Sequence, residues 1–145
     1  MHGPFLGPKK IKNENVDFII GDVRDKDSVD GVMSGVDIVF HAAALKQVPS
    51  CEFFPEQAIA TNIIGSNIVF NSAIKNNVSK VVALSTDKSV LPINAMGMSK
   101  SLMEKTLLSK ARKKKNKTIF TIVRYGNVIY SRGSVIPLFS SQIIN

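Results

Sequence analysis

The sequence predicts an α/β fold built on a parallel sheet of about four short strands, with helices on both faces. Four short apolar runs rich in β-branched residues alternate with longer stretches of helical periodicity. The runs are almost continuously apolar, as expected for strands covered on both sides. A chain of 145 residues, 44% of them hydrophobic, is long enough to form one domain around a buried core.

The predicted elements follow one another along the chain after an irregular lead-in over residues 1–15. The strands expected are Val16–Ile20, Val36–Phe40, Lys80–Leu84 and Thr118–Val123. The helices expected are a short one ending at Met33, Pro55–Lys75 and Ala95–Lys113, followed by an apolar segment over Val135–Ile144. We therefore expect a single domain over residues 16–145.

Local signals mark where these helices begin. Asp27 or Ser28 can cap the first helix, Pro55 suits the first turn of the second, and Asn94 can cap the third. The stretch Leu45–Phe54 shows no such pattern and is predicted to be a loop.

Reactive side chains are concentrated after the predicted strand Lys80–Leu84. Thr86, Asp87 and Lys88 supply a hydroxyl, an acid and a base in sequence. In the helix that follows, Met96 and Lys100 lie four residues apart on one face. Ligands of parallel α/β sheets bind beyond the carboxyl ends of the strands, so this stretch is the predicted active site. An ordinary polar loop that caps a helix is the alternative.

Composition excludes several classes of protein. No apolar run is long enough to cross a membrane, and a single cysteine, Cys51, excludes an intrachain disulfide and fits a reducing cytoplasm. The net charge of +8 gathers in the run over residues 110–117, which contains no aromatic residues for stacking on bases. We predict a cytoplasmic protein with no metal site and no membrane or nucleic-acid partner.

Seven sequence fragments occur together in the order found in one known family. They are Gly21–Asp25 (GDVRD), His41–Pro49 (HAAALKQVP), Thr61-Asn62 with Gly65, Leu84–Lys88 (LSTDK), Pro92–Lys100 (PINAMGMSK), Arg124–Val128 (RYGNV) and Arg132–Phe139 (RGSVIPLF). The chain thereby resembles the extended short-chain dehydrogenase/reductases. Among them it is most similar to the 5-inverting UDP-N-acetylglucosamine 4,6-dehydratases of capsular polysaccharide biosynthesis.

The resemblance implies a partial Rossmann-like domain that binds NAD rather than NADP. Asp22 and Val23 would hold the adenine, and the small residues Ala42, Ala43 and Ala44 would line the cofactor near its ribose and pyrophosphate. Lys46 would lie near the cofactor or the substrate, Asn62 would tie backbone and water together under the site, and Lys100 would hold the nicotinamide ribose. No glycine-rich pyrophosphate loop follows a strand, and the family's C-terminal substrate region is missing, so the chain is expected to be a fragment that self-associates to cover a sheet edge.

The same resemblance assigns the chemistry and the substrate contacts. Asp87 is expected to act as the acid at C6 of the sugar and Lys88 as the base at C5, or the reverse, with Thr86 beside them. Met96 stands where most relatives have a catalytic tyrosine, and a thioether cannot carry a proton. The groups expected to face the UDP-sugar are Lys46, Asn127, Arg132, Ser134 and Val135.

The leading prediction is NAD-dependent 4,6-dehydration of UDP-N-acetylglucosamine, and three alternatives remain. A UDP-sugar 4-epimerase shares the fold, the cofactor and the first oxidation step. A non-catalytic fragment without competent cofactor binding is the second alternative. A polyanion-binding protein that uses the basic run is the third.

Overall fold

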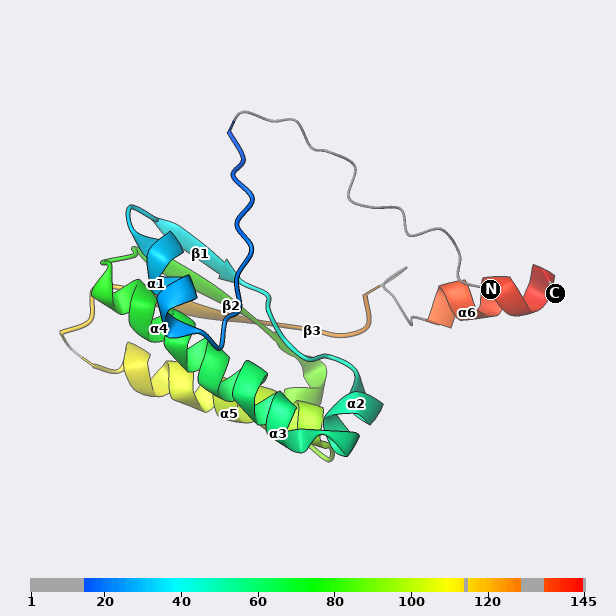
Figure 1. Ribbon diagram of the computed structural model, residues 1–145. Coiled ribbons are helices and arrows are strands. Elements are labelled where there is room, and N and C mark those ends of the chain that lie inside the picture. The colour runs from blue at the N-terminus through cyan, green and yellow to red at the C-terminus, as the bar shows by residue number, and fades with distance from the viewer. Residues whose placement is uncertain (1–14, 114, 129–134, 145) are drawn as a thin grey trace.

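The computed structural model describes residues 15–113, 115–128 and 135–144 (Figure 1). Its sheet has three parallel strands in the order β1, β2, β3, and these are β1 (Ile38–His41), β2 (Lys80–Thr86) and β3 (Ile119–Tyr125). Phe40 of β1 lies beside Val82 of β2, which in turn lies beside Thr121 of β3. The predicted class, an α/β fold on a Rossmann-like parallel sheet, is confirmed.

The predicted first strand, Val16–Ile20, is wrong. This segment is irregular and pairs with none of the strands in the described part of the chain. The side chains of Phe18, Ile19 and Ile20 are exposed. A strand persists only where a neighbour satisfies its backbone N–H and C=O groups, so β-branched composition alone was not sufficient here.

The first helix ends at Met33 as predicted, but its cap differs, and a second helix lies where a loop was predicted. Helix α1 (Lys26–Met33) is capped by Asp25, whose side chain accepts from the backbone N–H of Asp27, and not by Asp27 or Ser28. Helix α2 (Val48–Phe53) lies inside the predicted loop, with Pro49 in its first turn. Proline has no backbone N–H, and the first turn of a helix needs none there for its own hydrogen bonds. Pro49 was therefore compatible with a short helix.

The long helix predicted over Pro55–Lys75 is observed, with a π-helical section in its middle. It consists of α3 (Pro55–Ala58), η1 (Ile59–Gly65) and α4 (Ser66–Lys75). A π-helical section widens the helix locally and rotates the residues that follow it. Such sections are frequent at functional sites.

Helix α5 (Ala95–Ala111) and α4 contact each other and pack on one face of the sheet (Figure 1). Phe70, Met103 and Val81 are buried between the helices and the strands. Side chains on the opposite face, such as Phe40 and Ile119, are exposed. The core therefore lies between the helices and the face of the sheet that they cover. Packing in the core fixes the position of α5 against β2 and β3.

The C-terminal helix α6 (Val135–Ile144) lies apart from the sheet (Figure 1). Its side chains Leu138, Phe139 and Ile143 are exposed. Among the described residues, no helix is both long enough and apolar enough to cross a membrane.

Candidate active site

The predicted acid–base pair lies in a tight turn at the carboxyl end of β2. This turn, η2 (Asp87–Ser89), is capped by Thr86, whose Oγ1 accepts from the backbone N–H of Lys88 at 3.3 Å. Thr86 Oγ1 donates to Asp87 Oδ1 at 2.9 Å, and Lys88 Nζ forms an ion pair with the same oxygen at 3.1 Å. The bonds from Thr86 and Lys88 lower the pKa of Asp87. Asp87 is therefore an exposed carboxylate that these two bonds hold in its ionised form.

Lys100 lies beneath this turn in a buried position. Its Nζ donates to the backbone oxygen of Leu84 at 2.8 Å. Burial lowers the pKa of Lys100 to about 8, against a smaller opposing effect of Glu104. Few lysines in proteins are buried with a pKa near the physiological range. Those that are buried in this way are often found in functional sites.

Met96 is a core residue. It is buried in a small cluster with Cys51 and Ala58. Two residues earlier, the Asn94 side chain accepts from the backbone N–H of Gly97 at 2.8 Å, so the predicted cap of α5 is confirmed. A Cβ atom added to Gly97 would collide with the backbone oxygen of Lys88, so this glycine lets α5 contact the turn directly.

A buried carboxylate that sequence reasoning did not select lies at the centre of this region. Glu104 forms an ion pair with Arg124 of β3, with 2.6 Å between Nη2 and Oε2. It also accepts from Ser85 and Ser89. Burial opposes ionisation, but the bonds from Arg124, Ser85 and Ser89 outweigh it and lower the pKa of Glu104 to about 2.

Asn62 links the π-helical section to the loop after β1 and to α5. Its Oδ1 accepts from the backbone N–H of Leu45 at 2.8 Å. Its Nδ2 donates to the backbone oxygen of Leu45 at 3.0 Å and to Ser99 Oγ at 2.9 Å. This fully buried amide therefore fixes the loop after β1 against the first turns of α5.

Replacing Asn62 with alanine is expected to lower the free energy of unfolding by about 2–4 kcal/mol, because it removes a fully buried amide and leaves the half-buried backbone groups of Leu45 without these partners. Urea denaturation followed by circular dichroism measures the change. The control is Asn71→Ala on the same long helix, where the amide is exposed and accepts from Lys110. Equal losses in the two variants would contradict the role of Asn62.

The loop after β1 carries the predicted small residues. Ala42 is exposed, while Ala43 and Ala44 are half-buried, and the neighbouring Lys46 is exposed. His41 precedes them, buried, with Nε2 2.7 Å from Ser66 Oγ. Burial first, and the charge of Lys100 second, lower the pKa of His41 to about 4, so the imidazole is neutral at physiological pH.

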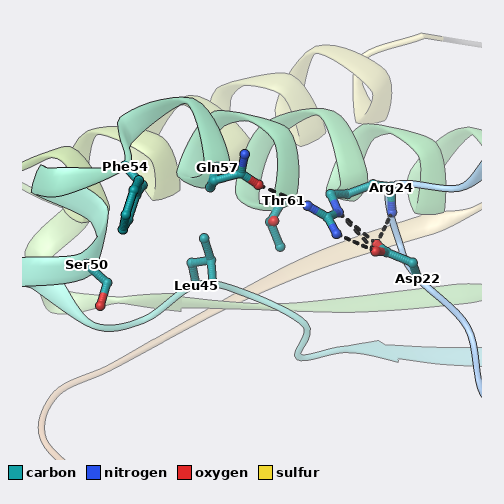
Figure 2. Close-up of a pocket in the computed structure, with 7 residues that line it drawn as sticks. All are labelled: Asp22, Arg24, Leu45, Ser50, Phe54, Gln57 and Thr61. Carbon is teal, nitrogen blue, oxygen red and sulfur yellow. Dashed lines mark hydrogen bonds and ion pairs between the residues drawn. The ribbon is translucent and has the colours of Figure 1, made fainter.

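A cavity of about 400 Å³ lies between this loop, the Asp22 turn and α3–η1 (Figure 2). Arg24 holds Asp22 in an ion pair of 2.6 Å and donates to Gln57 at 3.1 Å. The hydrogen bonds from Arg24 lower the pKa of Asp22 to about 2. Val23 is half-buried and packs against the core near Gly65, so its side chain faces away from solvent. The residues that line the cavity are Asp22, Arg24, Leu45, Ser50, Phe54, Gln57 and Thr61.

The predicted substrate contacts are only partly covered. Asn127 follows β3 and is exposed, and Val135 begins α6. Arg132 and Ser134 lie outside the described residues. Over the described ranges, no three His, Cys, Asp or Glu residues are grouped so that they could hold a metal ion.

Comparison with known proteins identifies the family. The model of the polysaccharide biosynthesis protein family matches residues 7–145. The chain belongs to this family. A relative of this family member, a UDP-glucose 4-epimerase of Rickettsia bellii, is 60% identical over 134 residues. The match covers 92% of this chain and 39% of the relative, so the chain spans about two fifths of the length of the curated proteins it matches.

Solved structures share the fold of this family member. Pen from Bacillus thuringiensis is 43% identical, with a TM-score of 0.87 over 92% of this chain and 41% of Pen. A UDP-glucose 4-epimerase from Thermotoga maritima, solved with UDP-glucose, is 25% identical, with a TM-score of 0.82 over 96% of this chain and 53% of the epimerase. MoeE5, solved with UDP-glucose and NAD, shows the same fold at 19% identity, with a TM-score of 0.74 over 87% of this chain and 46% of MoeE5.

These comparisons confirm the predicted resemblance to the nucleotide-sugar epimerases and dehydratases. The narrower resemblance to UDP-N-acetylglucosamine 4,6-dehydratases is not confirmed. The names of the curated relatives agree better with the alternative, the UDP-sugar 4-epimerase.

Proposed function

We propose that the chain forms the active-site part of a UDP-sugar 4-epimerase and that UDP-glucose is its substrate. The observation that carries this proposal is the cluster at the end of β2, where buried Lys100 bonds to Leu84 under the exposed Asp87–Lys88 pair. A carboxylate and an amine side by side can accept and donate a proton, which is what a reaction at a sugar hydroxyl requires. The 60% identity to a UDP-glucose 4-epimerase supports the choice of reaction.

The residues present fit a dinucleotide cofactor. The exposed Ala42 leaves room beside the loop that follows β1, and Asn62 holds that loop in place. The half-exposed carboxylate of Asp22 lines a cavity of a size that suits part of a nucleotide. Because Arg24 occupies both oxygens of Asp22, an adenine amine would share one of them with Arg24. When bound, NAD would take the hydride from C4 of the sugar and return it.

The chain's own residues would position the substrate and move its proton. Asp87 is the proposed acceptor of the 4-hydroxyl proton, since its carboxylate is exposed beside Lys88 and Met96 cannot serve. Lys88 would return a proton through its exposed Nζ, 3.1 Å from Asp87. This order reverses the acid and base roles that the sequence favoured. Lys100 would donate to the cofactor ribose from beneath.

A second candidate is 4,6-dehydration, which begins with the same oxidation at C4. The specific observation in its favour is the adjacent acid and base on one turn, with Met96 buried in the core. Such a pair can remove the C5 proton and protonate the departing C6 hydroxyl.

Incubation of the protein with NAD and UDP-glucose in D₂O tests both candidates. The proposed epimerase produces an isobaric product with inverted C4 and no deuterium at C5, as seen by mass spectrometry and proton NMR. A product that has lost one water and carries deuterium at C5 would reject the epimerase and support the dehydratase. The same incubation with UDP-N-acetylglucosamine tests the sugar. Absence of any product, together with no heat of NAD binding in calorimetry, would reject both and favour a non-catalytic fragment.

A further inference from the structure

Glu104 is the most completely bonded buried charge near the proposed active site. Its side chain is 5% exposed, and donors from three separate elements reach it. Arg124 of β3 donates through Nε to Oε1 at 3.0 Å and through Nη2 to Oε2 at 2.6 Å. Ser85 of β2 and Ser89 of η2 donate to Oε1, the latter at 2.8 Å. One carboxylate of α5 therefore joins the ends of two strands and the turn.

The two serines lie on either side of the acid–base pair in the sequence. Ser85 immediately precedes Thr86, and Ser89 immediately follows Lys88. Ser89 Oγ also lies 2.7 Å from the backbone oxygen of Thr86. Glu104 thus holds the residues on both sides of Thr86–Lys88. These two fixed points restrict the positions that the side chains of Thr86–Lys88 can adopt.

The link to Arg124 extends the same control to the end of β3. A Cβ atom added to Gly126, two residues beyond Arg124, would lie 3.6 Å from Asp87 Oδ2. The Asp87 carboxylate therefore lies directly over the end of β3. If the ends of β2 and β3 moved relative to each other, Gly126 would move against Asp87.

We propose that Glu104 is a positioning residue that sets the direction of Asp87 and Lys88 by holding the ends of β2 and β3 and the η2 turn together. It contacts neither of these side chains, and it acts through Ser85, Ser89 and Arg124. The effect on catalysis rests on the proposed function, whereas the effect on the turn does not.

Glu104→Gln in the full chain tests the proposal, with hydrogen–deuterium exchange as the main measurement. Two amides report on the turn: that of Lys88, which donates to Thr86 Oγ1, and that of Val90, which donates to the backbone oxygen of Asp87. We expect both to exchange at least about tenfold faster, while amides in α1 and α4 keep their rates. Glu56→Gln, the same chemical change at an exposed site on α3, is the control.

Two further variants keep the Arg124 ion pair and remove only the serine contacts. Ser85→Ala and Ser89→Ala are each expected to accelerate exchange at Lys88 and Val90 in the same direction. Unchanged exchange in the turn of Glu104→Gln would overturn the proposal. Acceleration spread evenly over β2, α4 and α5 would also overturn it, because Glu104 would then support only global stability.

Turnover separates this proposal from the proposed function. If the protein converts a UDP-sugar, Glu104→Gln is expected to lower kcat about 10- to 100-fold with KM nearly unchanged, because orientation and not binding is lost. If KM instead rose by about the same factor as kcat fell, substrate binding would be impaired as well, and the positioning role would be overturned. If the wild-type protein converts no UDP-sugar, the proposed function fails, and the exchange rates still decide the role of Glu104.

Discussion

The variant Lys100→Met is expected to be more stable than the wild type at neutral pH and to have lost its activity. Burial lowers the pKa of Lys100 from 10.5 to about 8, which means that the folded protein carries a poorly solvated charge at pH 7. A difference of this size corresponds to at most about 3 kcal/mol of stability. Methionine has a similar unbranched shape and removes that cost, although it also removes the bond to Leu84.

The pH dependence distinguishes this effect from simple repacking. Between pH 8 and 10.5 the unfolded chain keeps a proton on Lys100 that the folded protein has lost. The free energy of unfolding of the wild type therefore rises with pH through that window as far as Lys100 is concerned. Below pH 8 both states are protonated and the full cost remains. The advantage of Lys100→Met is thus largest at pH 7 and shrinks towards pH 10.5.

Urea unfolding of both proteins at pH 7 and pH 10 measures this difference, with turnover of UDP-glucose as the second readout. Lys105→Met, at an exposed position on the same helix, is the control and is expected to change neither quantity appreciably. We expect Lys100→Met to reduce kcat/KM by at least about 100-fold, since the amine would no longer contact the cofactor. A destabilised but active Lys100→Met protein would contradict both the charge cost and the proposed role.

Local signals in the sequence predicted much of the fold. The β-branched runs marked β2 and β3 within two residues, and Asn94 was correctly identified as the cap of α5. These elements are determined by nearest neighbours in the chain, through strand composition and through one side-chain bond at a helix end. The class of fold follows from their alternation.

Contacts between distant residues could not be predicted in the same way. Val16–Ile20 has the composition of a strand, but strand formation depends on a partner that no local pattern reveals. Glu104 pairs with Arg124, which is 20 residues away on β3 and therefore outside any helical spacing. The signal that could have revealed this pair is the position of Arg124 at a strand end next to the helix that carries Glu104.

For the candidate site, the sequence was sufficient to predict the family but not the reaction. Seven fragments in a fixed order were enough to predict the relationship to nucleotide-sugar epimerases and dehydratases, because each fragment belongs to the shared framework. The reaction was harder to predict, since both enzymes begin by oxidising C4 and differ only in what happens next. Self-association of the chain stays a prediction.

The second large effect is expected at the acid–base pair. Asp87→Asn and Lys88→Met should each lower kcat about 10²- to 10⁴-fold, because each removes one partner of the proposed proton transfer. Asp87 is exposed, Lys88 is half-buried and their ion pair lies at the surface, so the unfolding transition should change little. Steady-state turnover of UDP-glucose with saturating NAD measures kcat, and urea unfolding verifies the stability.

Asp37→Asn and Lys80→Met make the same chemical changes at exposed positions away from the turn, and they should retain wild-type turnover. Because Asp87 and Lys88 would act in one proton transfer, the double variant should be little slower than the slower single variant. Independent, multiplying losses would show that the two groups act in separate steps. That outcome would favour dehydration, in which one group works at C5 and the other at C6. Turnover within about twofold of wild type in Asp87→Asn would remove Asp87 from the mechanism and favour the buried amine of Lys100 as the base.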